Sequence, residues 1–228
     1  CHIYGAAKLN NSLFFLKFLV RFCRRIGSSL PLVSLQHQDV KINIELRKLS
    51  ELIKSSSANP NISSGGANPK LEASLFVDYI YLDTKERQIF TEKNHEYIIE
   101  QVQYDGEESM NLNSNRFISN MSFTQPVKEL FWVITNEDRL AQTYTGQGNS
   151  LLDFSLFNST DEFETAVLKI NGVDRFSPRD PLYFRIIQPL QHHTNIQKDK
   201  CIYCYSFSVN PEEMQPSGSC NFSSLDNS

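Results

Sequence analysis

The sequence predicts an all-β fold, a sandwich or jelly roll with one short helix and long loops. The first observation is an alternation of apolar and polar residues with a period of two, which is typical of a strand buried on one face. It is clearest in residues 40–47, where every second side chain is apolar. The second observation is that long polar segments separate the short apolar ones. Many short strands joined by long loops are typical of sandwiches and jelly rolls.

Several segments have the pattern of strands. In residues 40–47 the side chains of Val40, Ile42 and Ile44 share one face, and we expect that face to lie in the core. Residues 75–82 and 127–134 should contribute the rest of the core, and the latter contains Trp132, the only tryptophan. The expected strands are residues 40–47, 75–82, 96–104, 127–134, 165–170 and 202–209.

Two local signals mark where strands end. Asp83 and Glu86 have the spacing of a capping box, which predicts a short helix that runs to about Glu92. Asn171 and Gly172 form a turn signal that ends the strand before them.

Three long loops connect the expected strands. They are polar and rich in Ser, Asn, Gly or acidic residues, and loops of this length are unusual in a compact domain unless they have a function. We therefore expect these loops to do more than connect strands. They are residues 54–70, 105–116 and 136–150.

The composition is that of a folded protein. The 228 residues are 40% hydrophobic and 21% charged, which excludes a disordered chain. The net charge of −4 argues against a protein that grips nucleic acid. Residues 13–20 are apolar but too short to span a bilayer. Because the first residue is Cys1, we expect a fragment or a processed product. The dense basic cluster is expected to be a solvated strand edge and consists of Lys17, Arg21, Arg24 and Arg25.

The cysteines do not predict a disulfide framework. There are five, an odd and sparse set, which fits a reducing compartment better than an oxidising one. Four Asn-x-Ser/Thr sequons are read as chance matches, since no secretory signal precedes them. They begin at Asn61, Asn120, Asn158 and Asn221.

Two pairs of residues are candidate metal ligands. Cys201 and Cys204 lie on an expected strand, where residues three apart point to opposite faces, so we expect half-buried structural cysteines. His192 and His193 are adjacent, whereas a cupin-type metal site uses a His-x-His pair whose rings share a face. We expect them to lie in a turn or an interface, and we predict no metal site.

No pattern for catalysis or cofactor binding is found. The chain has no Gly-x-Ser-x-Gly motif, and Gly146-Gln147-Gly148 lacks the third glycine and the helix of a phosphate loop. The acidic pairs Glu107-Glu108 and Glu212-Glu213 are read as solvated loop charges. The segment from Ser177 to Asp180 is read as a turn.

Six long stretches carry a family resemblance. From about residue 18 onward the chain resembles the major capsid proteins of nucleocytoplasmic large DNA viruses, the iridovirus, phycodnavirus and mimivirus relatives. One departure is Arg24-Arg25-Ile26-Gly27, where the family has an Arg-Asn-Pro-Gly-like turn. The stretches, in the family's order, are LPLVSLQHQDVKINIEL (30–46), YIYLDTKERQIF (79–90), HEYIIEQVQ (95–103), PVKELFWVI (126–134), DRFSPRDPLYFRIIQPLQHHTNI (174–196) and CIYCYSFSVNPEEMQPSGSCNFSSLDN (201–227).

The resemblance implies a fold and a function. Family members carry two jelly rolls in tandem, and three copies form a pseudo-hexagonal capsomer. It implies that residues 18–228 are the second jelly roll without its final strands, and that residues 1–17 are an unmatched segment. The function implied is that of a structural protein of an icosahedral virus shell. It would act as a homotrimer next to other capsomers and minor capsid proteins. It would be assembled in the host cytoplasm, near an internal membrane but neither inserted in it nor bound to nucleic acid.

Other functions remain open at this point. A minor capsid or scaffold protein of the same virus group would differ in what it assembles into. A jelly-roll carbohydrate-binding module would show a row of exposed aromatic side chains on one sheet face. An enzyme of the cupin class would bind a metal ion, which elemental analysis would detect.

Overall fold

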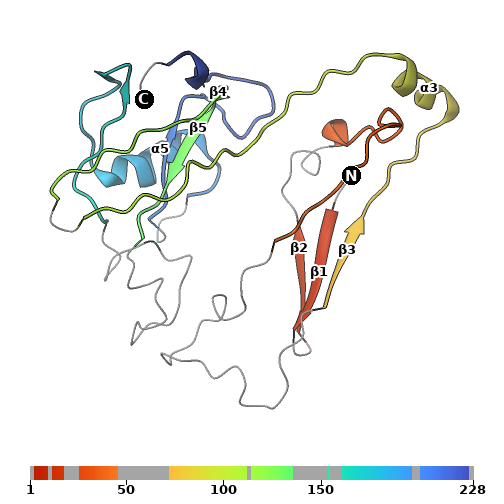
Figure 1. Cartoon of the computed structure of the whole chain (residues 1–228), viewed down its shortest axis with the longest axis horizontal. Coiled ribbons are helices and arrows are strands. Elements are labelled where there is room, and N and C mark those ends of the chain that lie inside the picture. Colours follow the sequence, from red (N-terminus) through yellow and green to blue (C-terminus); the bar gives the residue numbers. More distant parts are fainter. Residues whose placement is uncertain are drawn as a thin grey trace. The chain divides into compact units, whose positions relative to one another are not determined.

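The computed structural model describes residues 3–9, 12–17, 26–45, 72–111, 114–135, 154, 161–196 and 201–225. The chain divides into two compact units. The first comprises residues 1–47 and 61–102, and the second comprises residues 48–60 and 103–228. Figure 1 shows the elements of both units, which are described separately below.

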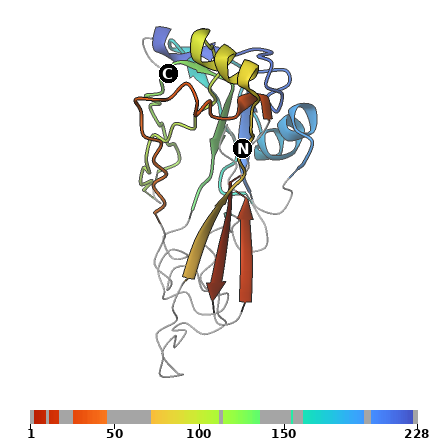
Figure 2. The same ribbon diagram turned by 90° about the vertical axis from the view of Figure 1, so that its right-hand side faces the viewer.

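The first unit contains a three-stranded antiparallel sheet. Its strands are β1 (Ile3–Leu9), β2 (Ser12–Lys17) and β3 (Glu72–Val77), in the order β2-β1-β3. Figure 2 shows the three strands side by side. A 3-10 turn, η1 (Ile26–Ser28), follows β2 in sequence. The alternation of apolar and polar residues did not reveal β1 or β2, because SLFFLK in β2 is apolar at four successive positions.

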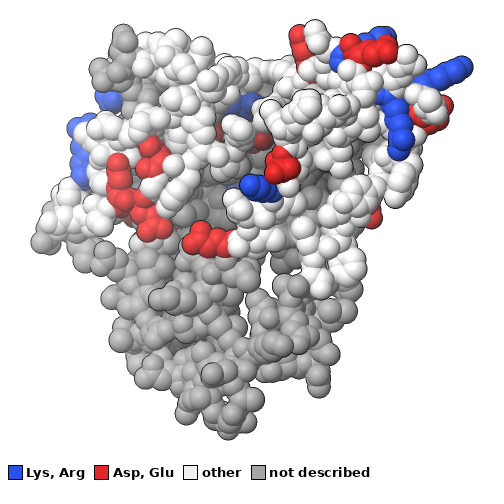
Figure 3. Space-filling view, turned by 45° about the vertical axis from the view of Figure 1, so that its right-hand side comes forward, with Lys and Arg blue, Asp and Glu red and all other residues white. Residues whose placement is uncertain are grey.

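The helix of the first unit begins where the capping box predicts. Helix α3 spans Thr84–Glu92. Asp83 Oδ1 accepts the backbone N–H of Glu86 at 2.8 Å, and Glu86 Oε2 accepts the backbone N–H of Asp83 at 3.2 Å. These two bonds satisfy donors that have no partner within the helix. The prediction is therefore confirmed at both ends. The helix surface carries charges of both signs, visible in the region of α3 in Figure 3.

Two predicted strands of the first unit are corrected by the structure. Within the described residues, 40–45 and 96–104 are not paired into a sheet. The predicted core face of the first is open, since Val40, Ile42 and Ile44 are 46%, 42% and 51% exposed. Alternation shows which side chains share a face, but that face is buried only where another element covers it. The strand expected at 75–82 ends at Val77, so it is confirmed in part.

The second unit contains three two-stranded antiparallel sheets. Strand β4 (Pro126–Val127) pairs with β9 (Cys220–Asn221), which leads into the 3-10 turn η4 (Phe222–Ser224). Strand β5 (Glu129–Trp132) pairs with β8 (Tyr203–Ser206), and β6 (Lys169–Ile170) pairs with β7 (Val173–Asp174). The strands expected at 127–134, 165–170 and 202–209 are each present in shorter form. The jelly-roll arrangement of the strands stays a prediction.

The turn between β6 and β7 is confirmed. Asn171 has φ of 52° and Gly172 has φ of 77°. Two successive residues with positive φ are what a two-residue hairpin requires, and Asn-Gly adopts them at low cost. Lys169 and Asp174 close the hairpin with an ion pair of 2.9 Å.

A second helical segment corrects the expectation of a single short helix. Residues 181–192 are continuously helical, with a π-helical part, η3 (Tyr183–Ile187), followed by α5 (Gln188–His192). Asp180 Oδ1 accepts the N–H of Leu182 at 2.8 Å and so caps the first turn. Pro189 lies inside this helical segment although it has no N–H to donate. The structure accommodates it with a wide turn, in which the N–H of Gln188 bonds to the carbonyl of Tyr183.

The core of the second unit is aromatic. Phe184, Cys201 and Tyr203 form its fully buried centre. The Trp132 ring lies 5.1 Å from that of Phe184, edge to face, and 5.9 Å from that of Tyr203. Among the residues whose side-chain burial the structure describes, which leaves out β1 and β2, the buried ones belong to this unit. Partly buried residues that pack against the centre are Trp132, Phe154, Phe163, Ala166, Phe176, Tyr183 and Tyr205.

We predict that Phe184→Ala lowers the free energy of unfolding by about 3–5 kcal/mol, because it empties a fully buried site. Phe184 is 1% exposed, whereas Phe117 is 45% exposed. The matched variant Phe117→Ala should change that free energy by only about 0.5 kcal/mol. Urea unfolding followed by tryptophan fluorescence measures both. Equal losses for the two variants would show that Phe184 is not at the centre of the core.

Candidate functional site

A buried ion pair holds the helical segment on the core of the second unit. Arg185 Nε donates to Asp161 Oδ1, and a terminal guanidinium nitrogen donates to Oδ2, both at 3.0 Å. The two side chains are 11% and 17% exposed. The hydroxyl of Tyr203 donates to the same Oδ1 at 2.8 Å. Asp161 therefore links the helical segment to strand β8 through three charge-assisted hydrogen bonds.

The protonation states of this cluster follow from its surroundings. Burial lowers the pKa of the Arg185 guanidinium, but the hydrogen bonds and charge of Asp161 outweigh it, so that this pKa is raised. Burial raises the pKa of Tyr203, and the neighbouring carboxylate of Asp161 raises it further. Tyr203 thus stays protonated and able to donate. A phenol and a guanidinium held in these states stabilise structure and do not activate a nucleophile.

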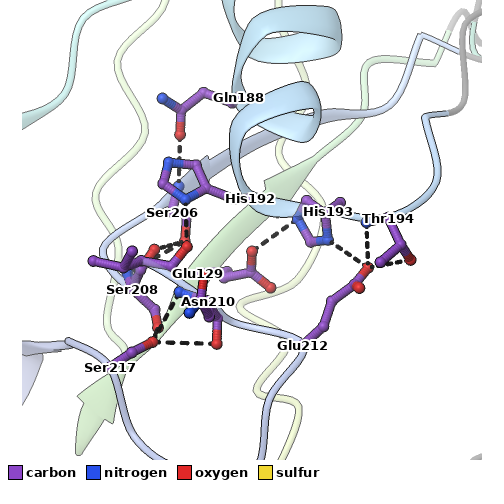
Figure 4. A network of polar contacts seen from close by, with 11 residues as sticks. Glu129, Gln188, His192, His193, Thr194, Ser206, Ser208, Asn210, Glu212 and Ser217 are labelled. Carbon is purple, nitrogen blue, oxygen red and sulfur yellow. Dashed lines mark hydrogen bonds and ion pairs between the residues drawn. The ribbon is translucent and has the colours of Figure 1, made fainter.

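Gln188 extends the polar contacts from the helix to β8. Its Oε1 accepts the backbone N–H of Ser206 at 3.0 Å, and its Nε2 donates to the hydroxyl of Tyr183 at 3.0 Å. Gln188 is buried, and these bonds satisfy both ends of its amide. They align α5 with the end of β8, as Figure 4 shows for Gln188 and Ser206.

A set of serines continues the network from β8 into the segment that follows it. Ser206 Oγ donates to the carbonyl of Ser208 at 2.7 Å, and the hydroxyls of Ser208 and Ser217 lie 2.7 Å apart. Ser217 Oγ also accepts the N–H of Asn210 at 2.8 Å. Residues 209–217, here called the 209–217 loop, are thereby closed on themselves. Gly218 follows with φ of 141°, and a Cβ there would lie 2.7 Å from the carbonyl oxygen of Phe207.

The two adjacent histidines have different partners, as Figure 4 shows. His192 ends helix α5, and its Nδ1 donates to the carbonyl of Val209 at 2.9 Å. His193 is the C-cap of the helix, with extended φ and ψ. Its Nε2 lies 2.8 Å from Glu129 Oε1 and its Nδ1 lies 3.3 Å from Glu212 Oε1. The histidines were expected in a turn or an interface, and the structure places them where helix α5 ends.

His193 therefore joins carboxylates from two other segments. Glu129 comes from β5 and Glu212 from the 209–217 loop. Burial raises the pKa of Glu129, although the nearby His193 and Lys128 act in the opposite direction. The backbone N–H of Thr194, which donates to Glu212 Oε1 at 3.1 Å, lowers the pKa of Glu212. The sequence placed Glu212 among the solvated loop charges and did not single out Glu129.

The cysteine pair lies in the core and is not arranged as a chelate. Cys204 is part of β8, whereas Cys201 precedes the strand and has φ of 48°. The expectation that both lie on a strand is corrected for Cys201. Burial raises the pKa of both thiols, to about 12 for Cys204, so neither is a ready thiolate ligand. Among the described residues, no group of three or more His, Cys, Asp or Glu side chains is placed to hold a metal ion.

The remaining sequence candidates are dispersed. Glu107 and Glu108 are exposed in an extended segment. Nearby, Asp105 accepts the backbone N–H of Ser122 at 2.9 Å and its hydroxyl at 2.7 Å, which lowers the pKa of Asp105. In the described ranges no helix is both long and apolar enough to cross a membrane. Candidates that lie outside the described residues are Cys1, Cys23, Asn61, Asn158, Gly146, Gln147, Gly148, Arg21, Arg24 and Arg25.

Comparison with protein families gives two matches in succession. Residues 86–228 match the family model described as large eukaryotic DNA virus major capsid protein. Residues 7–83 match the model described as major capsid protein N-terminus. These ranges divide the chain differently from the expected unmatched segment at 1–17 and single domain over 18–228. Where the domain boundary lies stays a prediction.

Curated relatives match along most of the chain. The major capsid protein of Pyramimonas orientalis virus is 35% identical over 98% of this chain and 54% of its own length. That of Paramecium bursaria Chlorella virus 1 is 32% identical over 94% of this chain and 53% of its own. That of Rana tigrina ranavirus is 26% identical over 90% of this chain and 48% of its own. The chain thus spans about half the length of these relatives.

The fold is similar to a solved virus capsid. A chain of the quasi-atomic model of the PBCV-1 virus capsid superposes with a TM-score of 0.70 and 28% identity. The match covers 95% of this chain and 56% of the other.

We predict that Asp161→Asn lowers the free energy of unfolding by about 3 kcal/mol, because it leaves the buried Arg185 charge without a counter-charge. Asp174→Asn is the matched control, since it breaks an ion pair whose side chains are about half exposed. It should cost at most about 1 kcal/mol. Urea unfolding of the two variants gives the comparison. A loss for Asp161→Asn no larger than that of the control would mean that the Arg185 pair does not hold the helical segment in place.

Proposed function

Because the chain belongs to the family of large eukaryotic DNA virus major capsid proteins, we propose that it forms part of the shell of an icosahedral virus. The observation that carries the proposal is the succession of two matched family models, which together cover residues 7–83 and 86–228. The family consists of structural capsid proteins rather than enzymes. The hydrogen bonds of Asp161, Gln188 and His193 fit a structural role, because each joins one segment of the chain to another.

The proposed domain boundary lies just before helix α3. The two matched family ranges meet between residues 83 and 86, where the capping box of Asp83 and Glu86 starts the helix. On this basis residues 7–83 belong to an N-terminal domain and residues 86–228 to a second domain, each of the jelly-roll type. The short antiparallel sheets β4–β9, β5–β8 and β6–β7 would be parts of the second jelly roll.

The proposed partners are further capsid subunits. In this proposal the whole protein forms a homotrimer, which contacts neighbouring capsomers and minor capsid proteins in the virion, after assembly in the host cytoplasm. One observation that supports protein contacts is an apolar surface on the helical segment. Leu182, Ile187 and Leu190 are 46%, 42% and 67% exposed there. Exposed apolar groups that lie together are typical of surfaces that bind other proteins.

A chimeric protein tests the proposed function. Residues 86–228 would replace the matching segment in the major capsid protein of Paramecium bursaria Chlorella virus 1. We expect the chimera to form the same discrete oligomer as its parent, as measured by size-exclusion chromatography with light scattering. The physical reason is that symmetric assembly reuses one interface, which a family member should preserve.

The control is the same chimera with the core variant Phe184→Ala. It should lose the discrete oligomer in proportion to its loss of folding, which shows that assembly depends on this segment. A chimera that melts cooperatively but stays monomeric would contradict the proposal.

A further inference from the structure

Three segments of the second unit meet at His193. The residue itself caps helix α5, Glu129 comes from strand β5, and Glu212 comes from the 209–217 loop. We propose that one proton shared by His193 and Glu129 fastens the 209–217 loop to the helix and the strand, and that the loop loosens when this proton is lost as the pH rises. This inference concerns the chain itself and does not rest on the proposed function.

The geometry requires a proton at this point. Both ring nitrogens of His193 face carboxylate oxygens, at 2.8 Å for Glu129 and 3.3 Å for Glu212. A neutral imidazole has one N–H, so its second nitrogen would present a lone pair to a carboxylate. An imidazolium can donate to both oxygens. A protonated Glu129 can donate to Nε2 while Nδ1–H donates to Glu212. In either form, the pair holds one proton more than the separate neutral imidazole and carboxylate.

The contact between Glu129 and His193 depends on the shared proton because the two atoms that meet are buried. Glu129 Oε1 and His193 Nε2 are both inaccessible to solvent, and within the described residues neither has a hydrogen-bonding partner beyond this mutual contact. The side chains of both residues are 14% exposed. If the proton leaves, the Glu129 carboxylate keeps its side-chain hydrogen bond with Ser206 but faces the lone pair of His193 Nε2 at 2.8 Å. Such an unsatisfied pair is costly in a protein interior, so the contact should open.

Other charged groups near the contact between His193 and Glu129 do not remove the need for the shared proton. Between β4 and β5, the Lys128 ammonium donates to the backbone carbonyl of Glu213 at 3.2 Å, and its charge only partly offsets the burial of Glu129. On β8, the Cys204 thiol has a pKa raised to about 12 and stays neutral. On α5, His192 donates to the Val209 carbonyl. In the loop, Glu213 follows Glu212 in the sequence and is a further carboxylate of the same segment.

The direction of the pH effect follows from the two carboxyl groups. The pKa of Glu129 is raised above its ordinary value of 4.5. Its contribution to the attachment of the 209–217 loop is therefore fully present below pH 4.5. That contribution is lost as the pH rises through the pKa of Glu129 in the folded protein. The pKa of Glu212 is lowered from 4.5, so its contribution is present above 4.5 and is lost as the pH falls through its folded-state value. The loop should therefore be held most firmly in mildly acidic solution.

The opening should be local. Near its other end the 209–217 loop is held by Ser217, which bonds to Asn210 and Ser208 through hydroxyl groups that do not titrate in this range. The aromatic core and the Asp161–Arg185 pair lie outside the contact. The backbone N–H of Thr194, which donates to Glu212, is the most direct reporter of the contact.

Hydrogen exchange of the full chain between about pH 5.5 and about pH 8.5 tests the inference. Protection factors, corrected for the intrinsic pH dependence of exchange, would be measured for segments that contain Thr194 and residues 210–214. Loss of one proton predicts that protection falls by up to about tenfold per pH unit. Residues 203–206 in the core should keep their protection. A flat profile at Thr194 and in residues 210–214 would overturn the inference.

Variants separate this contact from other titrating groups. Glu129→Gln replaces the carboxylate with an amide that can pair with a neutral imidazole, so the pH dependence should disappear while the loop stays protected. His193→Gln should also abolish the pH dependence. Glu213→Gln, which changes the neighbouring carboxylate in the same loop, should keep most of the original slope. If Glu129→Gln does not fold, His193→Gln carries the test. An unchanged slope in a folded Glu129→Gln or His193→Gln variant would overturn the inference.

Discussion

The carboxylate of Asp161 is the contact on which the arrangement of the second unit depends. It accepts bonds from Arg185 of the helical segment and from Tyr203 of β8, so it fixes the helix against the strand. Once that position is set, Gln188 reaches the backbone of Ser206 one turn further along. The end of the helix then brings His193 to Glu129, which lies opposite Ser206 in the β5–β8 pair. The polar network is thus a consequence of where the ion pair holds the helix.

Local features of this fold could be predicted from the sequence, whereas features that need a distant partner could not. The capping box at Asp83 and the Asn171-Gly172 turn depend on residues within three positions of one another, and both were confirmed. Residues 40–45 have the alternation of a buried strand, yet their apolar face is half exposed, because burial depends on an element that alternation does not specify. The contacts of Asp161 could not be predicted for the same reason. Asp161 lies 24 residues from Arg185 and 42 residues from Tyr203 in the sequence.

The histidine pair shows how the interpretation of a motif depends on the structure around it. His192 and His193 were expected in a turn or an interface, without a metal site. The structure places them at the end of a helix, where the C-cap geometry turns His193 toward two carboxylates. Its two partners, Glu129 and Glu212, come from different segments, so no local spacing in the sequence identifies them. The useful signal was Asp180 followed by Pro181, which is typical of a helix start.

The family resemblance predicted the function, whereas the structure shows the polar contacts within the second unit. The order of six matching stretches pointed to the capsid family, which no count of strands or charges could name. What distinguishes this chain physically is how its polar groups are used. Arg185 keeps its charge beside Asp161, because a guanidinium does not lose its proton in proteins. The contact of His193 with Glu129 holds its proton only conditionally. One unit therefore combines a permanent attachment at the core with a titratable one at a loop, and the loop can respond to pH without loss of the core.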